Sequence, residues 1–402
     1  MERVRSRVVL TVIPIVVLMG WVMPTVARAS HAPGARRNPG SDNYLVAVSA
    51  DSTTDAWTVG HFVNATTGAT QTLTLHWSSG SWTRVPSPNP GGKDANDTNE
   101  LFGVVALSPT DAWAVGNSSA GLSGPGRGLI IHWNGARWKK ATNPCSAADC
   151  FLQAVSADSQ SDVWAVGEIF VGHRAQSVVL HWDGISWSRT PSPERAFLQG
   201  VHAESPTDVW AVGYRQKETT DTFFTVAMHW DGMSWTRTPT PNPAGTGLNA
   251  ENFLMGVSGS DTDALAVGSF RVDGVTRTLS LHWTGLRWTR VRTPNPGRVS
   301  GGSVNELNGV AALSSTDAWA VGDASNGSRG WVRTLILHWD GGSWAKVKSP
   351  NPSGSQFPGV SRLYGVSADT ARDAWAVGSF RNQAGGYDTV ILHWNGRAWS
   401  RS

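Results

Sequence analysis

Charged residues and tyrosine are scarce in this 402-residue chain, and no segment after residue 30 has the apolar periodicity of a helix. Charged residues make up 16% of the sequence, and only four tyrosines are present. The motifs G-x-S-x-G and H-E-x-x-H and a nucleotide-binding glycine loop are all missing. The sequence therefore offers no familiar catalytic motif, and we name no catalytic residue and expect no cofactor.

Cysteine is nearly absent, since only Cys145 and Cys150 occur, both in the segment CSAADC. No histidine lies near them in the sequence, so they make a poor zinc site, and we expect no metal. In an exported protein two such cysteines can close a small disulfide loop, and two free thiols are the alternative. We expect the disulfide.

The first 29 residues have the pattern of an export signal. Arg3, Arg5 and Arg7 precede an apolar run from Val8 to Val26, and Ala27-Arg28-Ala29 matches the small-x-small cleavage pattern. The run is also about long enough to span a bilayer, so an uncleaved membrane anchor is the alternative. We predict a signal peptide over 1–29 cleaved after Ala29, a linker over 30–43, and a secreted, extracellular protein.

Removing that signal also removes the apparent basicity of the chain. Residues 1–29 carry four arginines and Glu2, and the whole chain has a formal net charge of +3. The remainder is therefore close to neutral. A near-neutral domain gives no electrostatic reason to expect a nucleic-acid partner.

Tryptophan and glycine, by contrast, are abundant, with 22 and 44 residues, and the tryptophans mark a repeat. Seven segments of the type DAWAVG recur about 50 residues apart, each followed by a segment of the type LHWDG and a further tryptophan. The opening aspartates are Asp55, Asp111, Asp162, Asp208, Asp263, Asp317 and Asp373. The three tryptophan positions account for all but two of the tryptophans, and Leu265 replaces the first of them in the fifth copy.

Each copy contains four short strand candidates, which in the last copy are 363–368, 373–378, 389–394 and 398–402. Steps such as Asp183-Gly184 between the third and fourth strands predict two-residue type I′ turns. Seven copies of four antiparallel strands predict an all-β fold, a seven-bladed β-propeller. The predicted blades are 44–100, 101–150, 151–196, 197–252, 253–306, 307–362 and 363–402.

Small residues mark the first strand of each copy, where seven innermost strands must crowd around an axis. These are Ala47, Gly103, Ala154, Gly200, Gly256, Gly309 and Gly365. Because the chain zigzags outward in each blade, loops 1–2 and 3–4 share one face and loops 2–3 and 4–1 share the other. The second set differs among copies, as in 61–71 and 214–222, and we expect function on that face, hereafter the variable face.

The DAWAVG strand and the LHWDGISW hairpin (180–187) resemble repeats of secreted bacterial propellers related to Asp-box (BNR) proteins, including the photosystem II assembly factor type, and of tectonin-type lectins. The resemblance covers about residues 44–402 and implies the propeller architecture. The chain departs from the Asp-box pattern, because His181 stands where Ser or Thr is expected and Asp183 precedes Trp187 by four positions. The subfamily therefore does not carry over.

The repeated histidines, aspartates and tryptophans could serve either as ligand-binding residues or as structural residues. The histidines of the LHW segments each belong to a different blade, too far apart to share one metal ion. They are His76, His132, His181, His229, His282, His338 and His393. We interpret them as buried, hydrogen-bonded structural groups, the recurring aspartates as residues that bond their own turn, and the tryptophans as core rather than sugar platforms.

The position just before the small residue of strand one differs in nearly every copy. It is occupied by Val46, Phe102, Gln153, Gln199, Met255, Asn308 and Tyr364. We expect it near the mouth of the central channel on the variable face. All of these except Val46 are predicted to bind a small polar ligand or a peptide, and simple tolerance of a half-exposed position is the alternative.

Three functions compete at this stage. The first is a monomeric, non-catalytic binding module for a carbohydrate or a cell-surface or protein partner. The second is a glycoside hydrolase or lyase with carboxylates on the loops, although no pair can be nominated from Glu168, Glu218, Asp221, Glu251 and Asp273. A sialidase would also need a tyrosine nucleophile and an arginine cluster, and Arg-Ile-Pro is missing. The third is an assembly or scaffold factor.

Overall fold

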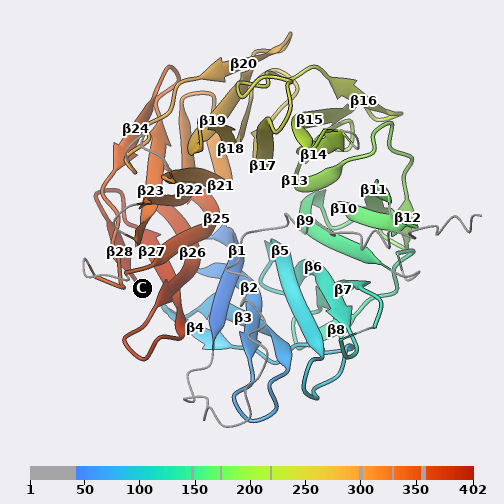
Figure 1. Cartoon of the computed structure of the whole chain (residues 1–402). Coiled ribbons are helices and arrows are strands. Elements are labelled where there is room, and N and C mark those ends of the chain that lie inside the picture. The colour runs from blue at the N-terminus through green and yellow to red at the C-terminus, as the bar shows by residue number, and fades with distance from the viewer. Residues whose placement is uncertain are drawn as a thin grey trace, which may run out of the picture. The chain divides into compact units, whose positions relative to one another are not determined.

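A computed structural model describes residues 42–402 except 123, 146–148, 173, 218–219, 298–301, 328–329 and 355–358. These residues form seven four-stranded antiparallel sheets arranged around one axis (Figure 1). The predicted all-β, seven-bladed propeller is therefore confirmed. The predicted signal peptide and residues 30–41 of the predicted linker lie outside the described residues. Within the described ranges, no helix has the length and apolarity needed to cross a bilayer.

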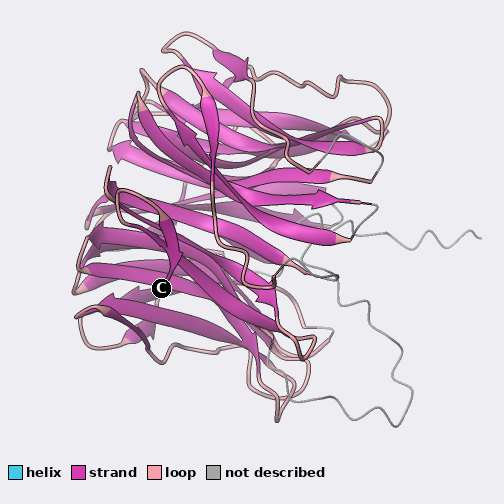
Figure 2. Ribbon diagram, turned by 90° about the vertical axis from the view of Figure 1, so that its left-hand side faces the viewer, coloured by secondary structure: helices cyan, strands magenta, loops and turns pink. Residues whose placement is uncertain are grey.

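The chain completes each blade before it enters the next, and the strands run between the two loop-bearing faces (Figure 2). Blades one to three comprise β1 Asn43–Ser52, β2 Asp55–Val63, β3 Thr70–Ser78, β4 Ser81–Arg84; β5 Thr98–Ser108, β6 Asp111–Ser119, β7 Arg127–Trp133, β8 Trp138–Lys140; and β9 Cys150–Ser159, β10 Asp162–Val171, β11 Arg174–Trp182, β12 Trp187–Arg189. Blades four and five comprise β13 Phe197–Ser205, β14 Asp208–Lys217, β15 Thr222–Trp230, β16 Trp235–Thr238; and β17 Glu251–Gly259, β18 Ala264–Val272, β19 Val275–Trp283, β20 Trp288–Val291. Blades six and seven comprise β21 Val304–Ser314, β22 Asp317–Asn326, β23 Trp331–Trp339, β24 Trp344–Val347; and β25 Ser361–Thr370, β26 Asp373–Arg381, β27 Tyr387–Trp394, β28 Trp399–Arg401.

Clusters of tryptophan fill the interfaces between blades. Trp57 on β2 packs against Trp133 and Trp138 of the second blade, with ring centroids 4.9 Å away in both cases. Five further interfaces repeat the cluster, and in the remaining one Leu265 packs against Trp339 and Trp344. Large aromatic rings contribute much buried apolar area, so the predicted packing role of the tryptophans is confirmed.

A half-buried histidine–aspartate pair joins strands two and three of each blade. The Nε2 atom of His76 lies 2.6 Å from a carboxylate oxygen of Asp55, and its imidazole stacks on Trp57 with centroids 4.1 Å apart. The other six blades have the equivalent histidine–aspartate pair. The histidines are hydrogen-bonded as expected, but they are half-buried and not fully buried, and the expected partner of the aspartate was wrong. Its carboxylate meets the histidine of strand three, because the Ser52 hydroxyl already accepts the turn's backbone N–H of Asp55.

The hairpins between strands three and four also differ from expectation. In the blade with Asp183, the carboxylate accepts the backbone N–H groups of Ile185 and Ser186, and only Gly184 has a positive φ. The loop is therefore a four-residue turn closed by a side chain. The two-residue type I′ turn occurs in the first blade, where Ser79 (φ 53°) and Gly80 (φ 79°) are both left-handed.

The small residues of the innermost strands sit where adjacent backbones meet. A Cβ placed on Gly365 would lie 2.8 Å from the carbonyl oxygen of Val46 in the first blade, and one on Gly103 would lie 2.9 Å from the backbone nitrogen of Val155. Such distances leave no room for a larger side chain. The predicted crowding around the axis is therefore real, and it acts between backbones.

The ring closes where the seventh blade meets the first. The Ser367 hydroxyl accepts the backbone N–H of Ala50 at 3.0 Å, and the Asp42 carboxylate accepts that of Tyr387 at 2.9 Å. Among the described residues, the sheets of these blades contain only β1–β4 and β25–β28. The two ends therefore close the ring by packing side by side, without sharing a strand.

Candidate functional site

Loops on the variable face are anchored by buried asparagines. Asn99 accepts the backbone N–H of Gly91 at 2.7 Å and donates to the carbonyl of Thr70 at 3.2 Å, which ties a 4–1 loop to the preceding blade. Asn252 and Asn305 make the same bonds. The 2–3 loops are shorter than predicted: β2 and β3 leave only 64–69 between them, and β14 and β15 leave 218–221. The longer connections of this face are therefore the 4–1 loops.

The binding residues predicted from the sequence all occupy one structural position, a β-bulge on the innermost strand. The register of strand one shifts at Phe102, Gln153, Gln199, Met255, Asn308 and Tyr364, and also at Val46. A bulge leaves one residue outside the regular ladder, which explains why this position varies in type. Their role in ligand binding stays a prediction.

Two of these bulge side chains contact side chains of strand two. Gln153 donates to the Glu168 carboxylate at 3.1 Å, and the Tyr364 hydroxyl lies 3.3 Å from that of Ser379. Asn308 instead donates to the carbonyl of Leu363 in the next blade at 2.9 Å. Gln199 is 7% exposed. The bulges therefore belong as much to the interfaces between blades as to the surface.

Two further sets of residues, which the sequence reasoning missed, lie toward the variable face from the bulges. The first set, two positions before each bulge, is Tyr44, Glu100, Phe151, Phe197, Phe253, Glu306 and Arg362. Its cross-strand partners, which follow the Val-Gly pair of strand two, are His61, Asn117, Glu168, Tyr214, Ser269, Asp323 and Ser379. We call both sets the axial residues. The sequence feature that could have identified these residues is that they vary among copies that otherwise match.

Axial residues of adjacent blades contact one another. Tyr214 of the fourth blade meets Phe253 of the fifth with ring centroids 4.9 Å apart. Arg362 Nε of the seventh blade lies 3.7 Å from an Asp323 oxygen of the sixth. A variable residue on strand two of one blade therefore meets a variable residue on strand one of the next. The residue types in contact consequently differ from one interface to another.

Blades three to five contain an aromatic sector, made of axial residues and of two further phenylalanines, Phe170 and Phe223. Phe197 stacks on Tyr214 with centroids 5.1 Å apart and an interplanar angle of 17°. Phe253 also meets Phe223 at 5.2 Å, and Phe170 connects the group to the third blade by its 6.2 Å contact with Phe197. Phe197 and Phe253 are half-buried, so part of this aromatic surface remains accessible.

Blades six and seven carry a charged sector instead. Glu306 and Asp323 are cross-strand partners, and Arg362 lies beside Asp323. Burial raises the pKa of Glu306 to about 7, with the nearby Asp323 adding to the effect. Burial likewise raises the pKa of Asp323 to about 6, against the opposing influence of Arg362. Two acids thus share one close cation.

Glu168 is an acid within the aromatic part of the ring. It belongs to β10, not to a loop as predicted, and Glu251 likewise belongs to β17; Glu218 lies outside the described residues. The Glu168 side chain is buried, its second carboxyl oxygen has no hydrogen-bond partner, and burial raises its pKa to about 8. Glu168 is therefore mostly protonated at neutral pH.

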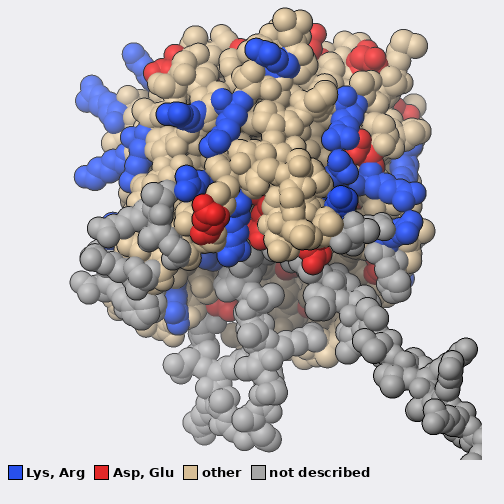
Figure 3. Space-filling view, turned by 45° about the horizontal axis from the view of Figure 1, so that its top comes forward, with Lys and Arg blue, Asp and Glu red and all other residues tan. Residues whose placement is uncertain are grey.

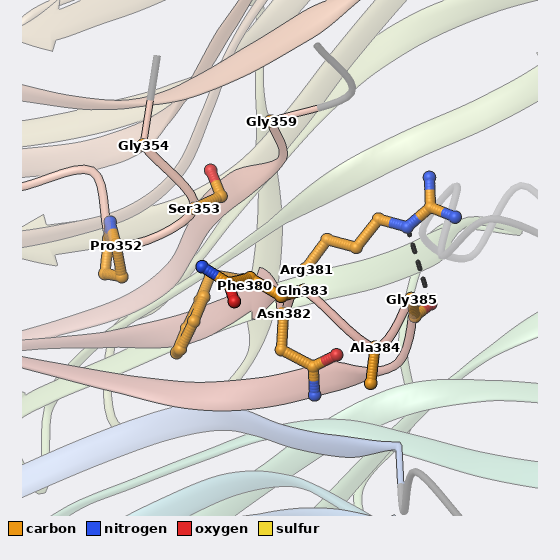
Figure 4. Close-up of a pocket in the computed structure, with 10 residues that line it drawn as sticks. All are labelled: Pro352, Ser353, Gly354, Gly359, Phe380, Arg381, Asn382, Gln383, Ala384 and Gly385. Carbon is orange, nitrogen blue, oxygen red and sulfur yellow. Dashed lines mark hydrogen bonds between the residues drawn. The ribbon is translucent and has the colours of Figure 1, made fainter. Parts of the chain in front are cut away.

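A groove of about 800 Å³ opens on the variable face between the sixth and seventh blades (Figure 4). One wall is the 4–1 loop at Pro352–Gly354 and Gly359, and the other is the end of β26 with the 2–3 loop that follows, residues 380–385. Arg381 extends along the second wall, and its Nε lies 3.4 Å from the carbonyl oxygen of Gly385. Sequence reasoning missed this groove, because its walls belong to different copies.

Other site predictions concern cysteines, metals and surface charge. Cys145 and Cys150 form a disulfide with their Cα atoms 6.0 Å apart. Within the described ranges, no three His, Cys, Asp or Glu residues are grouped so as to hold a metal ion. On the side of the molecule shown in Figure 3, Lys and Arg side chains are dispersed among uncharged surface. Each outermost strand carries one such residue two positions after its tryptophan, an arrangement that protects sheet edges.

Comparison with known proteins identifies the fold. No family model matches the chain, and no curated protein matches it. The solved structure "YCF48 bound to D1 peptide" is 12% identical, with 90% of this chain and 96% of that chain covered and a TM-score of 0.51. A Mycobacterium tuberculosis puromycin-hydrolyzing peptidase (9% identical, 89% and 52% covered, TM-score 0.49) and the propeller domain of the Pyrococcus furiosus Trilobed protease (9%, 90% and 97%, 0.48) are also similar. The expected resemblance to propeller proteins is confirmed for the fold.

Proposed function

We propose that this protein is an exported, non-catalytic scaffold that binds a segment of a partner protein on its variable face. The observation that carries the proposal is the distribution of variation among the seven copies. The tryptophan clusters and histidine–aspartate pairs repeat in nearly every blade, whereas the axial residues change from aromatic to charged around the ring. A surface that combines accessible aromatic rings with charged groups on a rigid scaffold suits recognition of a protein segment.

Two facts favour a peptide over other ligands. The similar structure of YCF48 has a D1 peptide bound, which shows that this architecture accommodates peptides. In addition, the tryptophans that could have served as sugar platforms are committed to packing between blades. Export is supported by the N-terminal sequence pattern alone.

The test is selection of a displayed library of random 12-residue peptides on the immobilised protein. We expect enriched peptides that bind wild type and lose affinity about tenfold for Phe253→Ala, which removes one ring of the aromatic sector. Met233→Ala is the matched control, because Met233 is 87% exposed on the opposite face. Failure to enrich any peptide, together with binding on a glycan array, would replace the proposal with a carbohydrate-binding function.

A second candidate, a glycoside hydrolase, is favoured by the cross-strand pair Glu306 and Asp323, because the raised pKa of Glu306 suits a general acid. Hydrolysis of a panel of polysaccharides by wild type and not by Glu306→Gln would support it. A panel left intact by wild type would remove it.

A further inference from the structure

We propose that the groove between the sixth and seventh blades binds a carboxylate, supplied by an acidic side chain of the partner segment. The inference rests on the proposed function and names the chemistry of its partner. The groove's volume of about 800 Å³ lies within the range of ligand sites, and both walls belong to the variable face.

The charge of the groove favours an anion. Arg381 is the charged residue among those described that line it, and no lining residue there is acidic. Apart from the contact of Nε with Gly385, its guanidinium has no partner in the described part of the chain, so both terminal amino groups are free to donate. Asp388 pairs with Phe380 in the ladder but does not line the groove.

Backbone donors occur in the turn that follows Arg381, along the same wall of the groove. In the turn after β26, the backbone N–H groups of Asn382, Gly385 and Gly386 are all bonded within the turn. Those of Gln383 and Ala384 form no hydrogen bond with any described residue. Guanidinium and amide N–H groups together match a carboxylate, which accepts hydrogen bonds at both of its oxygens.

The shape of the groove favours a peptide over an acidic sugar. Gly354 and Gly385 leave its walls without side chains at two points, so an extended backbone can approach closely. Phe380, the aromatic residue among the described lining residues, is 8% exposed, and the Arg401 guanidinium lies 4.9 Å from its ring centroid. The ring is therefore a poor platform for a pyranose to stack on.

The test uses full-length exported protein and peptides selected from the random 12-residue library. We expect enrichment of Asp or Glu at one fixed position. Synthetic peptides with that residue replaced by Asn or Gln should bind wild type about tenfold more weakly than the unchanged, parent peptide. The Arg381→Gln variant should bind the parent peptide more weakly than wild type does, by a similar factor. The two losses should not add when the changes are combined, since they remove the same contact.

Arg397→Gln is the matched control, because it removes an exposed cation from the same blade at a 3–4 hairpin on the opposite face. The affinity of Arg397→Gln for the parent peptide should equal that of wild type, and Arg381→Gln should keep the wild-type melting temperature. Parent peptides that bind Arg381→Gln as tightly as wild type, yet lose affinity for Phe253→Ala, would overturn this inference and leave the proposed function standing. Oligogalacturonate that binds wild type and not Arg381→Gln, with no peptide enriched, would overturn both.

Discussion

Trp375 of the seventh blade meets Trp82 of the first edge to face, with ring centroids 5.1 Å apart and an interplanar angle of 88°. This contact joins the two ends of the described chain, and it repeats the geometry found between Trp57 and Trp138 of consecutive blades. Among the described residues, ring closure therefore uses the same interface as the other tryptophan clusters, and the first and seventh blades share no strand. Stability of the closed ring should depend on this cluster directly.

Truncating Trp375 tests that dependence. Trp375→Ala should lower the free energy of unfolding by about 3–5 kcal/mol, because it leaves a cavity at the closing interface. Trp375→Leu should cost clearly less, since the equivalent Leu265 already packs against two tryptophans between blades five and six. Thermal denaturation of both variants measures the difference, and equal melting temperatures for the two would contradict a packing role.

Gly365 and Gly256 form a matched pair for the crowding around the axis. A Cβ at Gly365 would approach Ala47 Cα to 2.9 Å, whereas one at Gly256 would come no closer than 3.4 Å to the next blade. Gly365→Ala should destabilise the protein by about 1–3 kcal/mol through overpacking. Gly256→Ala should be close to neutral. Denaturant titration of both variants checks the order, and the reverse order would exclude the backbone explanation.

Glu168 should make stability depend on pH. Its pKa is about 8 when folded and near 4.5 when unfolded, so the folded state holds a proton that the unfolded state releases. Wild-type stability should therefore fall between about pH 4.5 and pH 8, by up to about 1.4 kcal/mol per pH unit, and level off above. Glu168→Gln removes this ionisation, so its advantage in melting temperature over wild type should grow across that window.

Lys139→Gln, on the exposed outer strand β8, is the control for that experiment. Its melting temperature should differ from wild type by the same amount at pH 5 and pH 8. An advantage of Glu168→Gln that stayed constant over this range would show that Glu168 is already ionised in the folded protein.

The strands and blades could be predicted because their determinants are local. The residues that make a segment such as DAWAVG a strand lie within a few positions of one another. Gly or Ala likewise recurs at the one crowded position of strand one. Turn chemistry was less predictable. Asp-Gly normally indicates a two-residue hairpin, yet the Asp183 side chain closes a longer turn, and the two-residue turn belongs to Ser79-Gly80.

The candidate site was predicted only in part, for a related reason. The bulge residues could be identified from the sequence as one position that varies among the seven copies. The neighbouring variable positions, which contain Tyr214 and Phe253, were not predicted. Their importance depends on contact between one blade's second strand and the next blade's first. The groove near Arg381 could not be predicted either, because its two walls, which include Gly354 and Gly385, come together only when the chain folds.

The sequence by itself determined the number of blades, the four strands in each and the residues that serve as scaffold, because seven aligned copies expose every local rule. Tertiary structure alone decided that aspartate pairs with histidine, that the described first and seventh blades pack without a shared strand, and that aromatic and charged sectors occupy different, adjacent parts of the ring. These features depend on how each blade is rotated against the next. That rotation is set by packing between residues about 50 positions apart, which no single repeat encodes.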